Sequence, residues 1–209
     1  MTIIQNSSLI EVAETIADNK FVLGDALVQI GISAPNLESS LASIAMAQAE
    51  LGHARLLYRW ADDLVGTKRD VQNQTGKAFS KVVHTSNWVS LIANVYVVNV
   101  AVDLVMRAIL DHKNPNINPP FTKMLKEQHE HLVYSRNWCQ LLLEDKGAVP
   151  RVFTNALEEA CVEAQQWLVK VSTDQSLIND SIILENNQIV SGFNNKINSL
   201  TTNGSVSYV

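Results

Sequence analysis

Two stretches of the chain carry the same arrangement of acidic, histidine and tryptophan residues at a fixed offset. The shared positions are Asp25, Glu50, His53 and Trp60 in the first stretch and Asp103, Gln128, His131 and Trp138 in the second. All match except one, where Glu is exchanged for Gln. Four-helix bundles hold a pair of iron or manganese ions with an acidic residue on one helix and Glu-x-x-His on the next. The repeat therefore predicts two helix pairs derived from such a metal scaffold, with one ligand position changed.

Five long segments have the spacing of apolar residues that is typical of helices in a bundle. They are Leu9–Ile32, Leu37–Val65, Ser86–Asp111, Phe121–Asp145 and Arg151–Thr173. Breakers such as GISAPN and HKNPNINPP separate them, and no segment has the alternating pattern of a strand. The sequence therefore predicts an all-α fold, an up-down four-helix bundle with an additional C-terminal helix.

The length of 209 residues and the hydrophobic content of 46% predict one domain with an ample core. We expect the helical bundle to occupy residues 1–173. The remaining residues, 174–209, are rich in Asn and Ser, and we expect a short helix there followed by a mobile tail.

Charge and cysteine usage indicate the cellular setting. A formal net charge of −5 argues against a general nucleic-acid-binding protein. Cys139 and Cys161 are widely spaced, so we expect free thiols in a reducing compartment. The first residues lack the basic and apolar regions of a secretory signal. We therefore expect a cytoplasmic protein.

The segment from Val89 to Leu110 is apolar enough to raise the question of a membrane span. It also contains Asp103 and Arg107, and charged side chains are costly at the centre of a bilayer. We therefore predict a helix that is buried in a protein core, and no membrane partner.

Glu50 and His53 lie on an otherwise apolar helical stripe, and Gln128 and His131 lie on an equivalent one. The apolar members are Met46, Leu57, Trp60 and Leu64 in the first stripe and Met124, Trp138 and Leu142 in the second. Burial of a carboxylate is costly unless a cation neutralises it. Because carboxylates and imidazoles together suit iron, manganese or zinc, we expect an interior metal site that the two aspartates of the repeat also face.

Each residue of the repeat also has a simpler explanation. Asp103 can form an i,i+4 salt bridge with Arg107, and His131 lies in the polar run EQHEH. Asp25 can bond helix-end groups or a partner such as Lys20. The metal interpretation depends on the recurrence of the whole pattern.

Both halves of the repeat resemble one family. The run AELGHARLLYRWADDLVG resembles the Glu-x-Gly-His segment of the phenylacetyl-CoA oxygenase (epoxidase) di-iron proteins of phenylacetate catabolism. The runs VDLVMRAIL and LKEQHEHLVYSRNW resemble their second half, so that the resemblance covers roughly residues 19–145. It implies the ferritin-like fold. The family contains a catalytic di-iron subunit and a homologous structural subunit whose metal site has decayed.

The resemblance implies a set of metal ligands. They are Asp25, Glu50 and His53 in the first half, and Asp103, His131 and either Glu127 or Gln128 in the second. Catalytic members of the family have Glu at the position of Gln128. Glu127 precedes His131 by one helical turn and is the alternative ligand. Glu50 and His53 are the residues to which the resemblance assigns catalysis.

The resemblance also implies a function. Two iron ions, or manganese ions, would activate O2 to hydroxylate or epoxidise an acyl-CoA or another small hydrophobic substrate, with electrons from a separate reductase. The alternative is a non-catalytic partner that binds no metal and forms a hetero-oligomer with a catalytic homologue. Assembly of the chain with copies of itself, as a homo-oligomer, is an alternative to the hetero-oligomer. The third hypothesis for the function is a ferritin-like metal-storage or oxidase protein.

Overall fold

Helices form the regular structure of the described part of the chain. The computed structural model describes residues 6–66, 74–111, 113–114 and 121–202. Eight helices and no strands lie within these residues. The helices are α1 (Ser7–Gly31), α2 (Leu37–Val65), α3 (Ser80–Val83), α4 (Trp88–Asp111), α5 (Phe121–Leu143), α6 (Val149–Ser172), α7 (Gln175–Asn179) and α8 (Ile189–Thr202). The predicted all-α helical bundle is confirmed.

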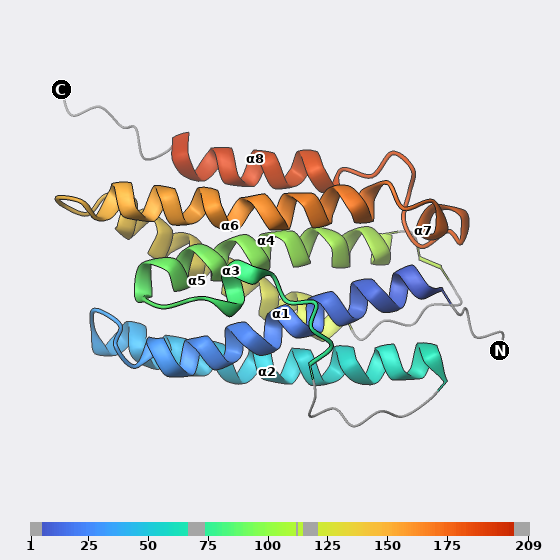
Figure 1. Ribbon diagram of the computed structural model, residues 1–209, viewed down its shortest axis with the longest axis horizontal. Helices are drawn as coiled ribbons and strands as arrows, with labels where there is room; N and C mark the ends of the chain where they lie inside the picture. Colours follow the sequence, from blue (N-terminus) through green and yellow to red (C-terminus); the bar gives the residue numbers. More distant parts are fainter. Residues whose placement is uncertain (1–5, 67–73, 112, 115–120, 203–209) are drawn as a thin grey trace.

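The long helices run along the long axis of the molecule (Figure 1). α1 packs mainly against α2, and α4 packs against α5 and α6. α8 covers α4 and α6 on the side away from α2 (Figure 1). Each of the five predicted segments contains one long helix, and the predicted ends agree with the structure to within about two residues, the usual uncertainty of a helix end.

Local sequence signals set the ends of α1 and α2. Asn6 and Asn36 precede the two helices, and their side-chain oxygens accept hydrogen bonds from backbone N–H groups of the first turn. α2 ends at Gly66, whose φ of 77° is the left-handed conformation that glycine adopts without a steric cost. These signals explain why the predicted bounds of α2 agree with the structure.

Two glycines bring α1 close to α2. A Cβ atom on Gly24 would lie 2.7 Å from Cγ of Leu51, and one on Gly31 would lie 2.6 Å from Cβ of Ser43. Both distances are too short for a Cβ atom unless the neighbouring side chain or a helix moves. The glycines therefore set the short separation of the two helices, which places the interior face of α1 against that of α2.

α4 is a core helix. It contacts α1, α5, α6 and α8, and nearly all its side chains from Leu91 to Met106 are buried. Among the described residues it alone is long and apolar enough to cross a membrane, and 83% of its most apolar stretch is buried inside the protein. The prediction that this apolar segment is buried in a protein core is confirmed.

The segment after α6 packs on the bundle. Ile189 and Phe193 of α8 are buried against the core formed by the longer helices. Before α1, the amide of Asn6 donates hydrogen bonds to Ser176 and Asp180, which ties the start of the bundle to α7. Residues 174–209 were predicted to form a short helix and a mobile tail; two helices, α7 and α8, lie in this segment, and residues 203–209 at its end lie outside the described residues.

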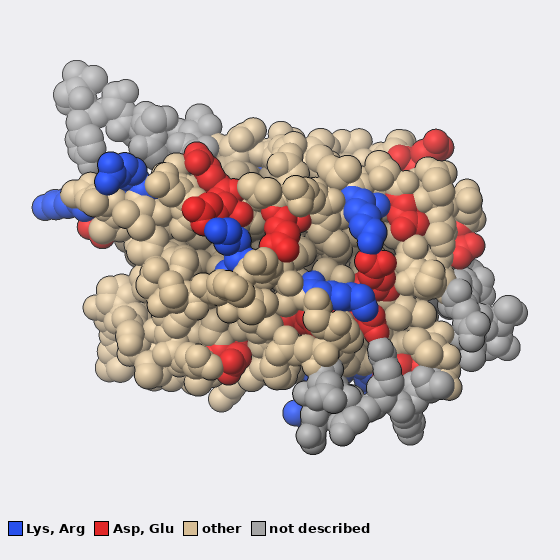
Figure 2. Space-filling view, in the orientation of Figure 1, with Lys and Arg blue, Asp and Glu red and all other residues tan. Residues whose placement is uncertain are grey.

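Lys and Arg side chains are interspersed with Asp and Glu on the face drawn in Figure 2. Exposed ion pairs include Lys81 with Glu159 and Lys170 with Glu11. Such surface pairs contribute little to stability, because water and salt screen them. The energetically important charges of this protein are therefore the ones inside the bundle.

Candidate metal centre

A lysine lies at the centre of the bundle. Lys20 of α1 is fully buried, and its Nζ atom lies 2.7 Å from Oε2 of Glu50 on α2. The same Nζ atom lies 2.7 Å from Oε1 of Gln128 on α5. The ammonium group donates hydrogen bonds to both oxygens. Its positive charge thus lies in the interior for which the sequence predicted a metal ion.

The inward position of Lys20 was missed by the sequence reasoning, although helix geometry contains the signal. Ile16, Leu23 and Leu27 are four, three and seven residues from Lys20, and all of them are buried. Residues at these spacings share one helix face. A lysine in the middle of an apolar stripe indicates either a side chain that reaches out to solvent or a buried cation.

Asp25 lies on the exposed side of α1, and the prediction that it faces the interior is wrong. Its Oδ2 atom accepts a hydrogen bond of 2.8 Å from Nε2 of Gln29. Successive helical residues point about 100° apart, so Asp25 cannot share the face of Lys20 and Gly24. Gly24 is the inward-facing residue one turn after Lys20. It has no side chain and therefore offers no metal ligand.

Asp103 is buried on α4, but it has a partner of its own. Nε of Arg107, one turn along the same helix, lies 3.0 Å from both carboxylate oxygens of Asp103. The arginine side chain is about half exposed, so its charge remains in contact with water. The i,i+4 salt bridge that the sequence allowed as the simpler explanation is therefore present.

Glu50 is ionised between two hydrogen-bond donors. Its Oε2 atom accepts from Lys20, and its Oε1 atom accepts from Nδ1 of His131 at 2.7 Å. Burial by itself would raise the pKa of Glu50, but the Lys20 ammonium and the His131 hydrogen bond hold this pKa far below its usual value. A protein cation thus does for this carboxylate what a metal ion was expected to do.

His53 is buried and neutral. Burial, with help from the Lys20 ammonium, lowers the pKa of His53 to about 4. Its Nε2 atom lies 2.6 Å from Oε2 of Glu127, so Nε2–H donates to that carboxylate. Its buried Nδ1 atom has no hydrogen-bond partner among the described residues. The lone pair of Nδ1 is therefore free.

Gln128, and not Glu127, faces the interior. Nε2 of Gln128 donates to the backbone and side-chain oxygens of Asn99 at 3.0 and 2.6 Å, while its Oε1 atom accepts from Lys20. An amide supplies both the donor and the acceptor that these neighbours need, and an ionised carboxylate would supply acceptors only. Glu127 is partly exposed and also contacts Lys123.

Three of the predicted site residues come together. Each of Glu50, His53 and His131 offers one ligand atom, and these atoms lie within 4.8 Å of one another. The two imidazole rings have centroids 5.8 Å apart, and both histidines are buried. The other predicted positions, Asp25, Asp103, Glu127 and Gln128, do not join this group, which is the one candidate of its kind in the described part of the chain.

The residues present do not fit a pair of metal ions. A paired carboxylate site uses a Glu from each of two helices and Glu-x-x-His from each of two others. Here Glu50 is the single carboxylate of the converging group, and the ammonium of Lys20 already neutralises it. On α1 the residue that reaches Glu50 is Lys20, on α5 Gln128 replaces a carboxylate, and on α4 the carboxylate of Asp103 is bonded to Arg107. A second ion would have too little negative charge around it.

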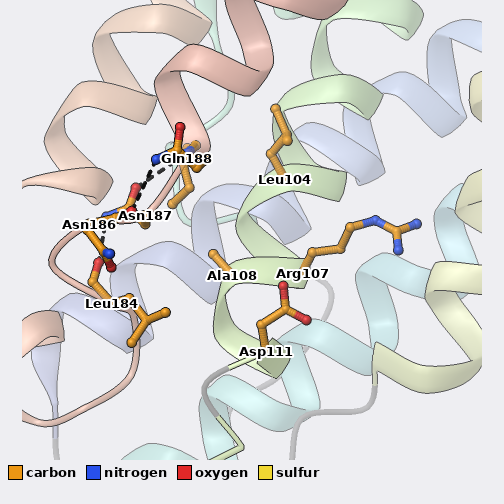
Figure 3. A pocket seen from close by; sticks show the side chains of 9 residues that line it. Leu104, Arg107, Ala108, Asp111, Leu184, Asn186, Asn187 and Gln188 are labelled. Carbon is orange, nitrogen blue, oxygen red and sulfur yellow. Dashed lines mark hydrogen bonds between the residues drawn. The ribbon is translucent and has the colours of Figure 1, made fainter.

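Two cavities differ in their relation to this centre. One of about 290 Å³ lies between α4 and the segment before α8, lined by residues that include Leu104, Leu184 and Gln188, and it contains none of the converging ligands (Figure 3). A second of about 300 Å³ lies between α2 and α5 and is lined by His131 and Tyr134, among others. The second cavity is therefore the one that reaches the buried centre.

Comparison with known families confirms the resemblance of the two runs. A family model described as phenylacetic acid catabolic protein matches residues 1–206. No curated protein matches the chain significantly. The family match spans nearly the entire sequence, and the helical bundle with its buried Glu and His residues is consistent with it. The chain therefore belongs to the phenylacetic acid catabolic protein family.

Proposed function

We propose that this protein is a non-catalytic subunit of a phenylacetyl-CoA-type oxygenase, which pairs with a catalytic homologue and binds no metal pair of its own. The observation that carries the proposal is the buried Lys20 ammonium, 2.7 Å from both Glu50 and Gln128. A metal pair and this ammonium would compete for the same carboxylate.

The balance of charge supports the proposal. Two divalent ions bring four positive charges, and carboxylates from several helices normally offset them. In this interior, the single negative charge of Glu50 is balanced by the single positive charge of Lys20. Addition of a metal pair would leave a large uncompensated positive charge in a low-dielectric interior, which is strongly unfavourable.

The same residues have a clear structural role. Lys20 of α1 bonds Glu50 of α2, and Glu50 bonds His131 of α5. Gln128 of α5 links Lys20 to Asn99 of α4. One network therefore joins four helices. Networks of this kind fix how helices are rotated and aligned relative to one another, because any other arrangement leaves buried polar groups unpaired. A stably aligned bundle is what a structural subunit has to present to its partner.

A di-iron oxygenase is the second candidate, and one observation favours it. Glu50, His53 and His131 retain the ligand types and the close approach of a metal site. This function requires Lys20 to leave the centre and a further anionic ligand to enter it. The substrate would be an acyl-CoA or another small hydrophobic compound, in accordance with the family.

Iron analysis separates the two candidates. The protein is reconstituted anaerobically with ferrous iron, dialysed and analysed for metal, with a catalytic homologue treated identically as the positive control. The expected result is two irons per chain for the homologue and none for this protein. Two irons per chain here would refute the proposal. Co-expression of the two chains tests the pairing, and we expect them to elute together from a sizing column as one hetero-oligomer.

A further inference from the structure

We propose that Lys20 keeps closed a site for one divalent transition-metal ion, formed by Glu50, His53 and His131, and that this site takes zinc once the ammonium group is removed. The inference rests on the proposed function, in which Lys20 stands in place of a metal cation. It adds that the remaining donors form a complete site for a single ion.

The donor set is the first argument. Two imidazoles and one carboxylate bind zinc in hydrolytic enzymes and ferrous iron in non-haem enzymes, with further positions left for water. Here one ligand atom from each of the three residues lies within 4.8 Å of the others. Ligand atoms held at about 2 Å from one ion lie closer together than 4.8 Å, so a small inward movement of the side chains is sufficient.

The state of His53 is the second argument. Its Nδ1 atom is buried without a hydrogen-bond partner among the described residues, although an unpaired buried polar atom is unfavourable. Its other nitrogen donates to Glu127 at 2.6 Å. Metal-bound histidines generally have this arrangement, in which one nitrogen binds the ion and the other donates to a carboxylate. His53 is therefore oriented and polarised as a ligand.

Lys20 is what blocks the site. Its Nζ atom lies against Oε2 of Glu50 and adds a positive charge next to the donors. A second ion lacks ligands independently of Lys20, because Gln128 is an amide bonded to Asn99 and the carboxylate of Asp103 is bonded to Arg107. Removal of the lysine therefore opens a site for one ion and not for two.

An ion also has a route to the donors. The cavity of about 300 Å³ between α2 and α5 is lined by His131 together with the carboxylates of Glu127 and Glu130. Small side chains, including Ala45 and Ala49, line the α2 side of this cavity. Negatively charged residues that line a cavity raise the local concentration of cations.

The test measures zinc in full-length variants. The wild-type protein, Lys20→Met and Lys126→Met are loaded with zinc, dialysed and analysed; Lys126 is an exposed lysine on α5 that serves as the matched control. We expect one zinc per chain in Lys20→Met and none in the other two. Zinc at about one hundred times its Kd should raise the melting temperature of Lys20→Met by roughly 5–10 °C. Lys20→Met/His53→Ala should lose both the zinc and this shift.

The outcomes separate the inference from the proposed function. A folded Lys20→Met that retains no zinc overturns the inference, and a metal-free wild type would still support the non-catalytic role. Two irons per wild-type chain overturn the proposed function instead. If Lys20→Met is unfolded without metal, circular dichroism follows its titration with zinc, and recovery of helix on zinc binding supports the inference. If Lys20→Met stays unfolded at every zinc concentration, Lys20→Gln is titrated with zinc instead. Absence of zinc binding by Lys20→Gln overturns the inference.

Discussion

The buried pair of Lys20 and Glu50 should have a large coupling energy in a double-mutant cycle. Both side chains are fully buried, and the charged atoms are 2.7 Å apart. At an effective dielectric constant of about 20, two unit charges at this distance attract by roughly 6 kcal/mol. Desolvation offsets part of this attraction, so the net value of the pair is modest. Removal of one partner alone, however, leaves an uncompensated buried charge, which typically costs about 3–5 kcal/mol.

The cycle compares the wild type with Lys20→Met, Glu50→Gln and the double variant. Each single substitution should lower the unfolding free energy by about 3–5 kcal/mol. If the unfolding free energy falls by about 2 kcal/mol per molar urea (the m-value), the urea concentration at the unfolding midpoint should fall by roughly 1.5–2.5 M. The double variant contains neither charge and retains an oxygen acceptor for His131. It should therefore cost no more than one single variant, which corresponds to a coupling energy of at least about 3 kcal/mol.

Urea unfolding followed by circular dichroism measures all four proteins, with EDTA present so that no metal stabilises Lys20→Met. The exposed pair of Lys81 and Glu159 provides the matched control, and its coupling energy should stay below about 1 kcal/mol. Additive effects of Lys20→Met and Glu50→Gln, or single effects below about 1 kcal/mol, would show that the two charges do not interact in the interior and would refute this account of the centre.

Three further predictions concern the same interior. Burial and the Lys20 ammonium lower the pKa of His53 to about 4, so the unfolded chain binds this proton first as the pH falls. The unfolding free energy should therefore decrease by up to about 3 kcal/mol between pH 6.5 and pH 4, and an unchanged pH dependence in His53→Gln would contradict this. Gly24→Ala should lower the unfolding free energy by about 1–3 kcal/mol through overpacking against α2. Gly52→Ala, in open space on α2, should raise it by up to about 1 kcal/mol. Urea midpoints that shift in the same direction in both variants would argue against the close approach of α1 to α2. Gln128→Glu removes a buried donor and should cost about 1–3 kcal/mol by the same assay, and a neutral effect would place this side chain outside the network.

Local signals explain what could be predicted from the chain. The helices follow from apolar spacing and from terminal residues such as Asn36 and Gly66, which act within a few residues of themselves. The recurrence of Glu-x-x-His also identified residues that meet. Glu50, His53 and His131 lie on the buried stripes of their own helices, and in the folded bundle these stripes face the same interior, where the three residues meet.

The centre itself was decided by tertiary structure. One residue along a helix changes the direction of a side chain by about 100°, and this separates buried Gln128 from partly exposed Glu127, and inward Gly24 from exposed Asp25. The spacing of apolar residues within one helix does not show which of two adjacent residues faces the interior, because this depends on the other helices that pack against it.

The sequence by itself determined an all-helical chain with an acid and two histidines on inward stripes, because these properties are local to each helix. Only the arrangement of α1, α2 and α5 around one interior decided which cation neutralises the acid. The long side chain of Lys20 could extend to solvent or turn inward. It turns inward because Glu50 and Gln128, from two other helices, present oxygen atoms at hydrogen-bond distance from its ammonium group.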